Sequence, residues 1–64
     1  MIGYVAKDKN GEVYLHTEEP AYDDRLKGWY SAPDMINITN QFSEFDNMSY
    51  NDKPIKVEIK LEKV

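Results

Sequence analysis

Few residues in this sequence are of the types that perform covalent or acid–base chemistry. The chain contains no cysteine and a single histidine, His16. Nucleophilic catalysis requires an activated serine, cysteine or lysine beside an oriented base. His16 precedes Thr17 in a segment with the composition of a β-strand, where a histidine usually packs or lies at the surface. The sequence therefore predicts no catalytic residue, and a protein that is not an enzyme.

Acidic side chains occur next to one another at two places, Glu18-Glu19 and Asp23-Asp24. Paired carboxylates act as acid and base where a pocket separates their pKa values, but segment 17–28 has the composition of an open loop. Residues 8–12 share features with a calcium loop, although the EF-hand pattern needs a longer ligand series and flanking helices. We expect these groups to be solvated or to form a turn, with no metal ion and no cofactor.

Aromatic residues are the most suggestive feature. They make up 12% of the chain, too many for a domain of 64 residues to bury. Aromatic side chains with a polar tip are enriched at protein interfaces, whereas those that stack on single-stranded bases need a basic groove. In one interpretation, tryptophan and phenylalanine form the core while the tyrosines cover its edges. The other is a candidate interaction surface made of Tyr4, Tyr14, Trp29, Tyr30 and Tyr50.

A β-hairpin is predicted to position two of these tyrosines. Segments 2–6 and 13–17 are rich in aromatic and β-branched residues, and they flank Asp8-Lys9-Asn10-Gly11. A two-residue turn at Asn10-Gly11 would pair Ala6 with Leu15. A type I turn followed by Gly11 with a positive φ would instead pair Val5 with Leu15, and we favour it because Asp8 suits its first position. One face then carries Val5, Val13 and Leu15, and the other carries Tyr4, Ala6, Tyr14 and His16.

A second strand is predicted near the end of the sequence. Residues 55–61 alternate strictly between apolar and charged types after Pro54, which indicates a half-buried strand. Segments 28–31, 35–38 and 48–50 are candidates for shorter strands, and 17–28 for a loop. Residues 40–45 are compatible with one helical turn, capped by Thr39 or Asn40.

Together these elements predict a single domain over residues 1–64. The fold class is mainly β, a small antiparallel sheet of about four strands that starts with a β-hairpin, with one short helical turn. The predicted core consists of Val5, Val13, Leu15, Trp29, Ile36, Ile38, Phe42, Phe45, Ile55, Val57, Ile59 and Leu61.

Charge and hydropathy narrow the classes of partner. The net charge is −4. Segment 28–52 has no lysine or arginine, and its acids are Asp34, Glu44, Asp46 and Asp52. Binding to nucleic acid is disfavoured, because clustered basic residues supply that affinity. No segment is long and apolar enough to cross a bilayer, and no signal peptide is evident. We expect a cytoplasmic protein that binds neither nucleic acid nor membrane.

Both ends of the sequence resemble a group of small proteins. The stretch 4–15, followed by Pro20 and Trp29, is similar to the start of small uncharacterised proteins of bacteriophages and mobile elements of gut Bacteroidales. Residues 48–58 resemble their ending. The chain departs from that pattern at Ser43, where proline is expected, and at Tyr50, where tryptophan is usual. The resemblance implies no activity, only an accessory role for a phage or mobile element in the bacterial cytoplasm.

The leading functional hypothesis is a non-enzymatic protein-interaction module that binds through its sheet or its aromatic residues. One alternative is an acidic inhibitor of a nucleic-acid-binding host defence enzyme, with segment 28–52 facing the basic channel of that enzyme. The other is a purely structural homo-oligomer. A homodimer through a strand edge or through the second face of the sheet is also expected to be favourable, since a small core benefits from extra burial.

Overall fold

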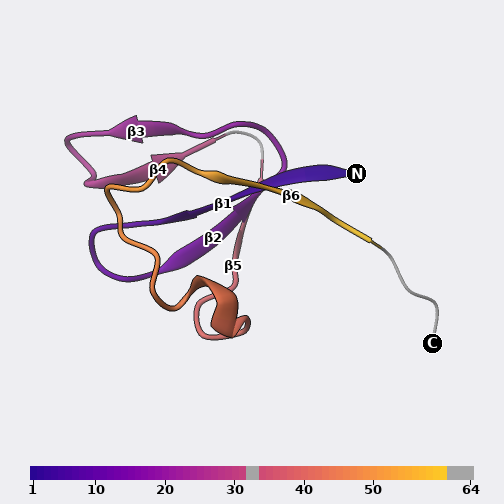
Figure 1. Cartoon of the computed structure of the whole chain (residues 1–64). Helices are drawn as coiled ribbons and strands as arrows, with labels where there is room; N and C mark the ends of the chain where they lie inside the picture. The colour runs from indigo at the N-terminus through magenta and orange to yellow at the C-terminus, as the bar shows by residue number, and fades with distance from the viewer. Residues whose placement is uncertain (32–33, 61–64) are drawn as a thin grey trace.

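The fold is mainly β, as predicted, with one short helical turn (Figure 1). A computed structural model describes residues 1–31 and 34–60. The strands in these ranges are β1 (Ile2–Lys7), β2 (Val13–His16), β3 (Ala21–Asp23), β4 (Gly28–Tyr30), β5 (Met35–Asn37) and β6 (Ile55–Glu58), and the helical turn is the 3₁₀ segment η1 (Ser43–Phe45). An antiparallel sheet has the order β5-β2-β1-β6, and β3 and β4 form a separate hairpin. No helix in the described ranges is long and apolar enough to span a membrane.

The first hairpin adopts the register that its turn residues favour. Val5 lies opposite Leu15. The N–H of Asp8 donates to the carbonyl of Glu12 at 2.8 Å, and the N–H of Gly11 donates to the carbonyl of Asp8 at 2.9 Å. Gly11 has a φ of +91°, a conformation that glycine adopts without steric cost. The prediction of a longer turn is confirmed, and with it the assignment of residues to the two faces of β1 and β2.

Segment 17–28, predicted as a loop, contains the strand β3. Tyr22 lies opposite Trp29 in the β3–β4 pair, and their rings stack with centroids 5.4 Å apart. The turn between the two strands is held by the Asp23 carboxylate, which accepts hydrogen bonds from the N–H groups of Arg25 and Leu26. This cross-strand aromatic pair gives a reason for a strand in a polar stretch without hydrophobic alternation.

Two further predictions for the middle of the chain need correction. Residues 48–50 do not form a strand, because the Asp52 carboxylate accepts the Ser49 N–H at 2.8 Å and closes a turn there. The helical turn covers only the end of segment 40–45, and neither predicted cap serves it. Instead, the Thr39 hydroxyl accepts the N–H of Val13 at 2.9 Å and ties this segment to the sheet. Asn40 has a φ of +64°, outside the helical range.

The sheet is buried on both faces at its centre. On one face, Val5, Val13, Ile38 and Met48 form the core, with Leu15, Phe45 and Val57 packed against it. On the other face, Ala6 and His16 are fully buried, and His16 contacts Ser31, which directly follows β4. The β3–β4 hairpin lies over one side of β1 and β2 (Figure 1). The β1–β2 pair is therefore the middle layer of the molecule.

The core is smaller than the sequence pattern predicts. Ile36, Phe42 and Ile55 are 52%, 47% and 42% exposed, respectively. Ile36 and Ile55 lie on the two outer strands of the sheet, where covering layers are incomplete. Met48 belongs to the core although it was not predicted there, and Leu61 lies outside the described residues.

Candidate functional site

Two of the five aromatic residues predicted to form an interaction surface meet in the structure. The indole Nε1 of Trp29 donates to the backbone carbonyl of Tyr50 at 3.2 Å. The Trp29 ring also stacks on Tyr22, at an interplanar angle of 25°. The ammonium of Lys9 lies 5.9 Å from the centre of the Tyr50 ring. Sequence analysis missed Tyr22 because it lies in a segment predicted as a loop, whereas in the structure it faces Trp29 across the β3–β4 hairpin. It missed Lys9 because this residue, in the turn of the first hairpin, approaches Tyr50 only in the folded chain.

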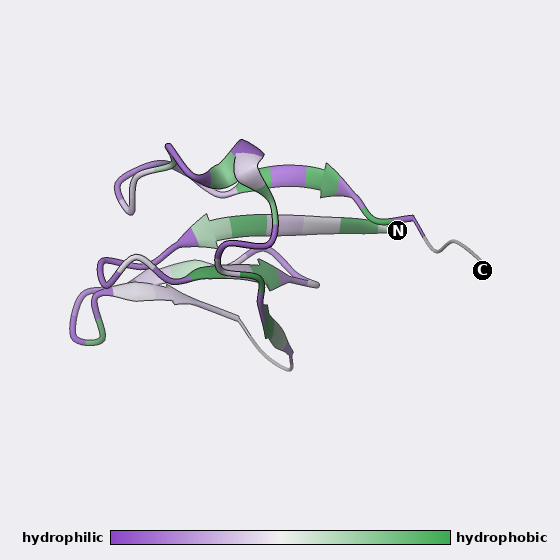
Figure 2. Ribbon diagram, turned by 90° about the horizontal axis from the view of Figure 1, so that it is seen from below, coloured by the Kyte–Doolittle hydropathy of each residue, from purple (hydrophilic) through white to green (hydrophobic). Residues whose placement is uncertain are grey.

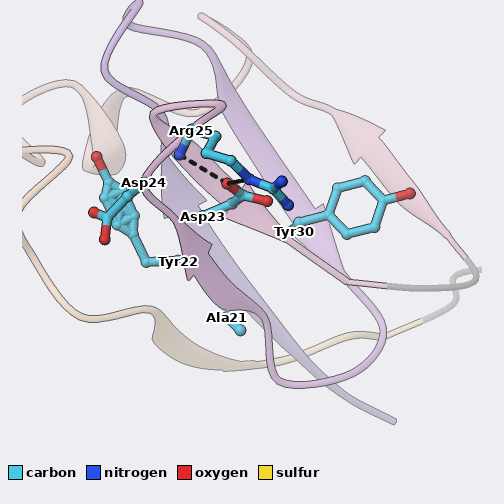
Figure 3. A pocket seen from close by; sticks show the side chains of 6 residues that line it. All are labelled: Ala21, Tyr22, Asp23, Asp24, Arg25 and Tyr30. Atoms are coloured by element: carbon cyan, nitrogen blue, oxygen red, sulfur yellow. Dashed lines mark hydrogen bonds and ion pairs between the residues drawn. The ribbon is translucent and has the colours of Figure 1, made fainter.

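The other three predicted aromatic residues have separate surroundings. Tyr14 donates its hydroxyl proton to Glu12 Oε2 at 2.6 Å, and this bond, with burial, raises the pKa of Tyr14 above its ordinary 10.0. Tyr4 lies on β1 between His16 and Lys56. Tyr30 is 58% exposed and projects away from Tyr22 on the β3–β4 hairpin (Figure 3). Trp29 and Tyr14 thus make contacts within the fold, whereas Tyr30 is exposed.

A pocket of about 420 Å³ lies at the β3–β4 hairpin (Figure 3). Its charged groups are Asp23, Asp24 and Arg25. Asp23 Oδ1 is already bonded to two backbone N–H groups of the turn, and the Arg25 Nε lies 3.9 Å from the same oxygen. The Arg25 side chain is 93% exposed. Asp23 and Arg25 thus stabilise a solvent-exposed turn, and Asp24 beside them is exposed to solvent.

The only histidine forms a buried contact with a serine. His16 Nδ1 lies 2.8 Å from Ser31 Oγ, and His16 Nε2 is buried with no hydrogen-bond partner among the described residues. Burial lowers the pKa of His16 from its ordinary 6.5, and the charge of Asp8 opposes that shift. A serine–histidine pair is a catalytic arrangement where substrate can reach it. Here His16 is fully buried and Ser31 is 9% exposed, so the contact holds the two layers together.

The acids of segment 28–52 are distributed over the molecule. Asp34 immediately precedes β5, whose first residue lies opposite His16. Asp46 lies near the other end of the sheet, where its backbone carbonyl accepts a hydrogen bond from Lys7. The Asp52 carboxylate closes a turn, and Glu44 lies at an apolar groove. Asp34 is therefore near the opposite end of the sheet from Asp46, whereas Glu44 and Asp46 are both at η1.

That apolar groove lies between η1 and the sheet and has a volume of about 550 Å³. Val5, Leu15 and Ile38 contribute from the sheet and its continuation. Phe42 and Phe45 contribute from η1 and the residue before it, with ring centroids 6.3 Å apart in an edge-to-face arrangement. Val57, Glu58, Ile59 and Lys60 also line the groove. The sequence marks the apolar members as core, but it does not show that they leave a groove open.

Strand β6 forms an edge of the sheet next to this groove. Figure 2 shows it with the hydrophobic and hydrophilic residues that alternate along it. The N–H of Ile59 donates to the carbonyl of Met1 at 2.6 Å, and the amino group of Met1 approaches the carbonyl of Ile59 at 3.4 Å. Hydrogen-bonded pairs alternate along an antiparallel ladder. Ile55 and Val57 therefore direct their backbone groups toward β1.

The backbone groups of Lys56 and Glu58 consequently point away from the sheet. Within residues 1–31 and 34–60, no strand pairs with this side of β6. Unpaired N–H and C=O groups on an edge strand are a template for another strand. The candidate site is thus the outer edge of β6 together with the apolar groove beside it.

The described residues contain no group of three or more histidine, aspartate or glutamate side chains that could hold a metal ion. In comparisons with known proteins, no family model, curated protein or solved structure matches this chain.

Proposed function

We propose that this protein is a non-enzymatic protein-interaction module, which binds an extended segment of a protein chain along the outer edge of β6. The observation that carries the proposal is the coincidence of two features at one place. The outward backbone groups of Lys56 and Glu58 lack strand partners among the described residues, and an apolar groove adjoins the same strand.

Strand addition uses both features at once. An added strand gains affinity from main-chain hydrogen bonds, and pockets for alternate side chains give specificity. Residues on one face of the added strand would lie beside Val57 and Ile59, at the groove. Residues on its other face would meet Lys56 and Glu58. A suitable partner segment therefore alternates between apolar side chains and charged side chains of both signs.

The other candidate functions have less support from the rest of the chain. The serine–histidine contact is buried, which argues against a catalytic role. Asp34 lies near the opposite end of the sheet from Asp46, which argues against a single acidic face that mimics nucleic acid. From the resemblance of segments 4–15 and 48–58, we propose that the module serves a phage or mobile element in the bacterial cytoplasm.

Site-specific photo-cross-linking tests the proposal. A photoreactive amino acid replaces Lys56 at the edge of β6, and in a control it replaces Glu19, which is exposed between β2 and β3. In a gut Bacteroidales strain that expresses the protein, we expect cross-links from position 56 to an extended segment, identified by mass spectrometry. Absence of cross-links at position 56, or equal cross-linking from position 19, would contradict the proposal.

A further inference from the structure

We infer that the segment that adds to β6 is the β6 strand of a second copy of this chain, related by a two-fold axis that passes beside Val57. This inference rests on the proposed function and names the partner of the same site. Three independent properties of β6 select this partner and this register: the direction of its backbone groups, the order of its charges and the position of its apolar residues.

The backbone groups of β6 that point away from the sheet can pair with those of the second copy in this register. Antiparallel pairing about an axis at Val57 places Lys56 opposite Glu58 of the partner subunit, and Glu58 opposite Lys56 of the partner subunit. These are the residues whose N–H and C=O groups point outward from β1, as the Met1–Ile59 pairing shows. Each such pair can exchange two N–H···O=C bonds, as hydrogen-bonded antiparallel pairs do. Val57 then faces Val57 of the partner subunit in a non-hydrogen-bonded pair, where side chains approach most closely.

The charged side chains of the two β6 strands are complementary in the same register. Directly opposite residues of two paired strands lie on the same face. Each lysine at position 56 would therefore meet a glutamate at position 58 across the axis, on both sides of it. The side chain of Glu58 is 54% exposed and Lys56 is exposed, so both are available for this contact. Glu58 Oε1 also lies 3.5 Å from the amino group of Met1, an exposed pair that leaves its other oxygen free to accept.

Neighbouring registers are disfavoured by the same charges. Moving the axis to Lys56 would place the two copies of Lys56 opposite each other. Moving it to Glu58 would oppose the two copies of Glu58, and would pair Lys56 with Lys60 of the partner subunit. Like charges directly opposite each other destabilise a strand pair. The sequence of β6 thus allows self-pairing in one register and opposes it in the two nearest alternatives.

The apolar face gains burial in this arrangement. Ile55 would lie opposite Ile59 of the partner subunit, and the reverse pair would form on the other side of the axis. Ile55 is 42% exposed in the single chain, and Val57 and Ile59 line the groove. The grooves of the two copies would open on the same side of one continuous sheet, so an apolar surface would extend across the axis. Covering exposed isoleucine side chains favours association.

Sedimentation equilibrium of the purified chain and of charge variants tests the inference. We expect the wild-type chain to dimerise, and K56E or E58K to raise the dissociation constant of the dimer by about tenfold or more, because each places like charges opposite each other twice. The double variant K56E/E58K exchanges the charges and should restore the dimer. An equal mixture of K56E and E58K should also dimerise, because each introduced charge then faces its opposite.

Matched variants control for net charge. K53E and E19K make the same changes of charge as K56E and E58K at exposed positions outside β6, and should leave the dimer unchanged. Circular dichroism verifies that each variant is folded. A wild-type chain that is monomeric at every concentration, or single variants that the double exchange does not rescue, would overturn the inference. Cross-links from position 56 to a different protein, with a monomeric purified chain, would overturn it while the proposed function stands.

Discussion

The carboxylate of Asp8, in the turn of the first hairpin, accepts a hydrogen bond of 2.8 Å from the backbone N–H of Trp29 in the second hairpin. A backbone bond from Lys9 N–H to the Lys27 carbonyl, at 3.1 Å, lies beside it. Gly28 permits this approach, because a Cβ atom at that position would lie 2.8 Å from the Asp8 carboxylate carbon. The Asp8–Trp29 bond therefore joins the β3–β4 layer to the central sheet at the end remote from His16.

Replacement of Asp8 by alanine should destabilise the protein. The Trp29 N–H would lose its acceptor in a partly buried place, which costs about 1–3 kcal/mol of unfolding free energy. Chemical denaturation measures this change. Asp24→Ala is the matched control, since Asp24 is exposed in the neighbouring turn. Equal stability of the two variants would show that the bond contributes little.

Replacement of Gly28 by alanine should also destabilise the protein, by about 1–3 kcal/mol, since the added methyl group would press on the Asp8 carboxylate. The double variant D8A/G28A should lose less stability than the sum of the two single changes, because the alanine at position 8 removes the atoms that clash. A double-mutant cycle measures this coupling. Strict additivity would contradict the contact.

Stability should fall as the pH decreases below the ordinary pKa of histidine, about 6.5. Burial lowers the pKa of His16 in the folded chain, so the unfolded chain binds the proton more readily. The contribution of neutral His16 is fully present above the unfolded pKa, and it is lost as the pH falls toward the folded pKa.

His16→Gln provides the comparison, because His16 is the only histidine in the chain. Denaturation midpoints measured between about pH 7 and pH 5.5 should decrease for the wild type and change less for this variant. Parallel curves for the two proteins would assign the pH dependence to other groups.

The two phenylalanines at the groove should differ in their effect on stability. Phe45 packs against the core, whereas Phe42 is 47% exposed. We expect Phe45→Ala to cost about 2–4 kcal/mol and Phe42→Ala about half of that or less. Thermal or chemical denaturation measures both. Equal losses would mean that Phe42 is as much a part of the core as Phe45.

Turn chemistry made the first hairpin predictable. Asp8 and Gly11 occupy the positions that the longer turn requires, and that turn determines the partner of Val5. By contrast, β3 depends on the stacking of Tyr22 on Trp29. The polar segment around Tyr22 shows no alternation of apolar and polar residues, so the sequence does not predict a strand there. The residues that determine a turn are adjacent in the sequence and can be recognised there. A stacking contact between two strands is not visible in the local sequence.

The candidate site could be predicted only in part. The alternation from Ile55 to Leu61 predicts a half-buried strand, of which β6 covers Ile55–Glu58. Residues 59 and 60 lie beyond its end, and Leu61 is outside the described residues. Sequence alone does not place this strand at the edge of the sheet. The groove combines Phe42 and Phe45 with Val57, which is distant in the chain. The burial of His16 likewise depends on a second layer that covers one face of β2, so its neighbours in sequence do not indicate it.

Amide hydrogen exchange at Lys56 and Glu58, followed by NMR at low and high concentrations of the purified chain, tests association at the β6 edge most directly. The N–H groups of these two residues point outward, whereas those of Ile55 and Val57 face β1. We predict that exchange at Lys56 and Glu58 slows as the concentration rises, while the amide of Glu19 exchanges equally fast throughout. Rapid exchange at Lys56 and Glu58 at every concentration would contradict strand pairing between two copies at this edge.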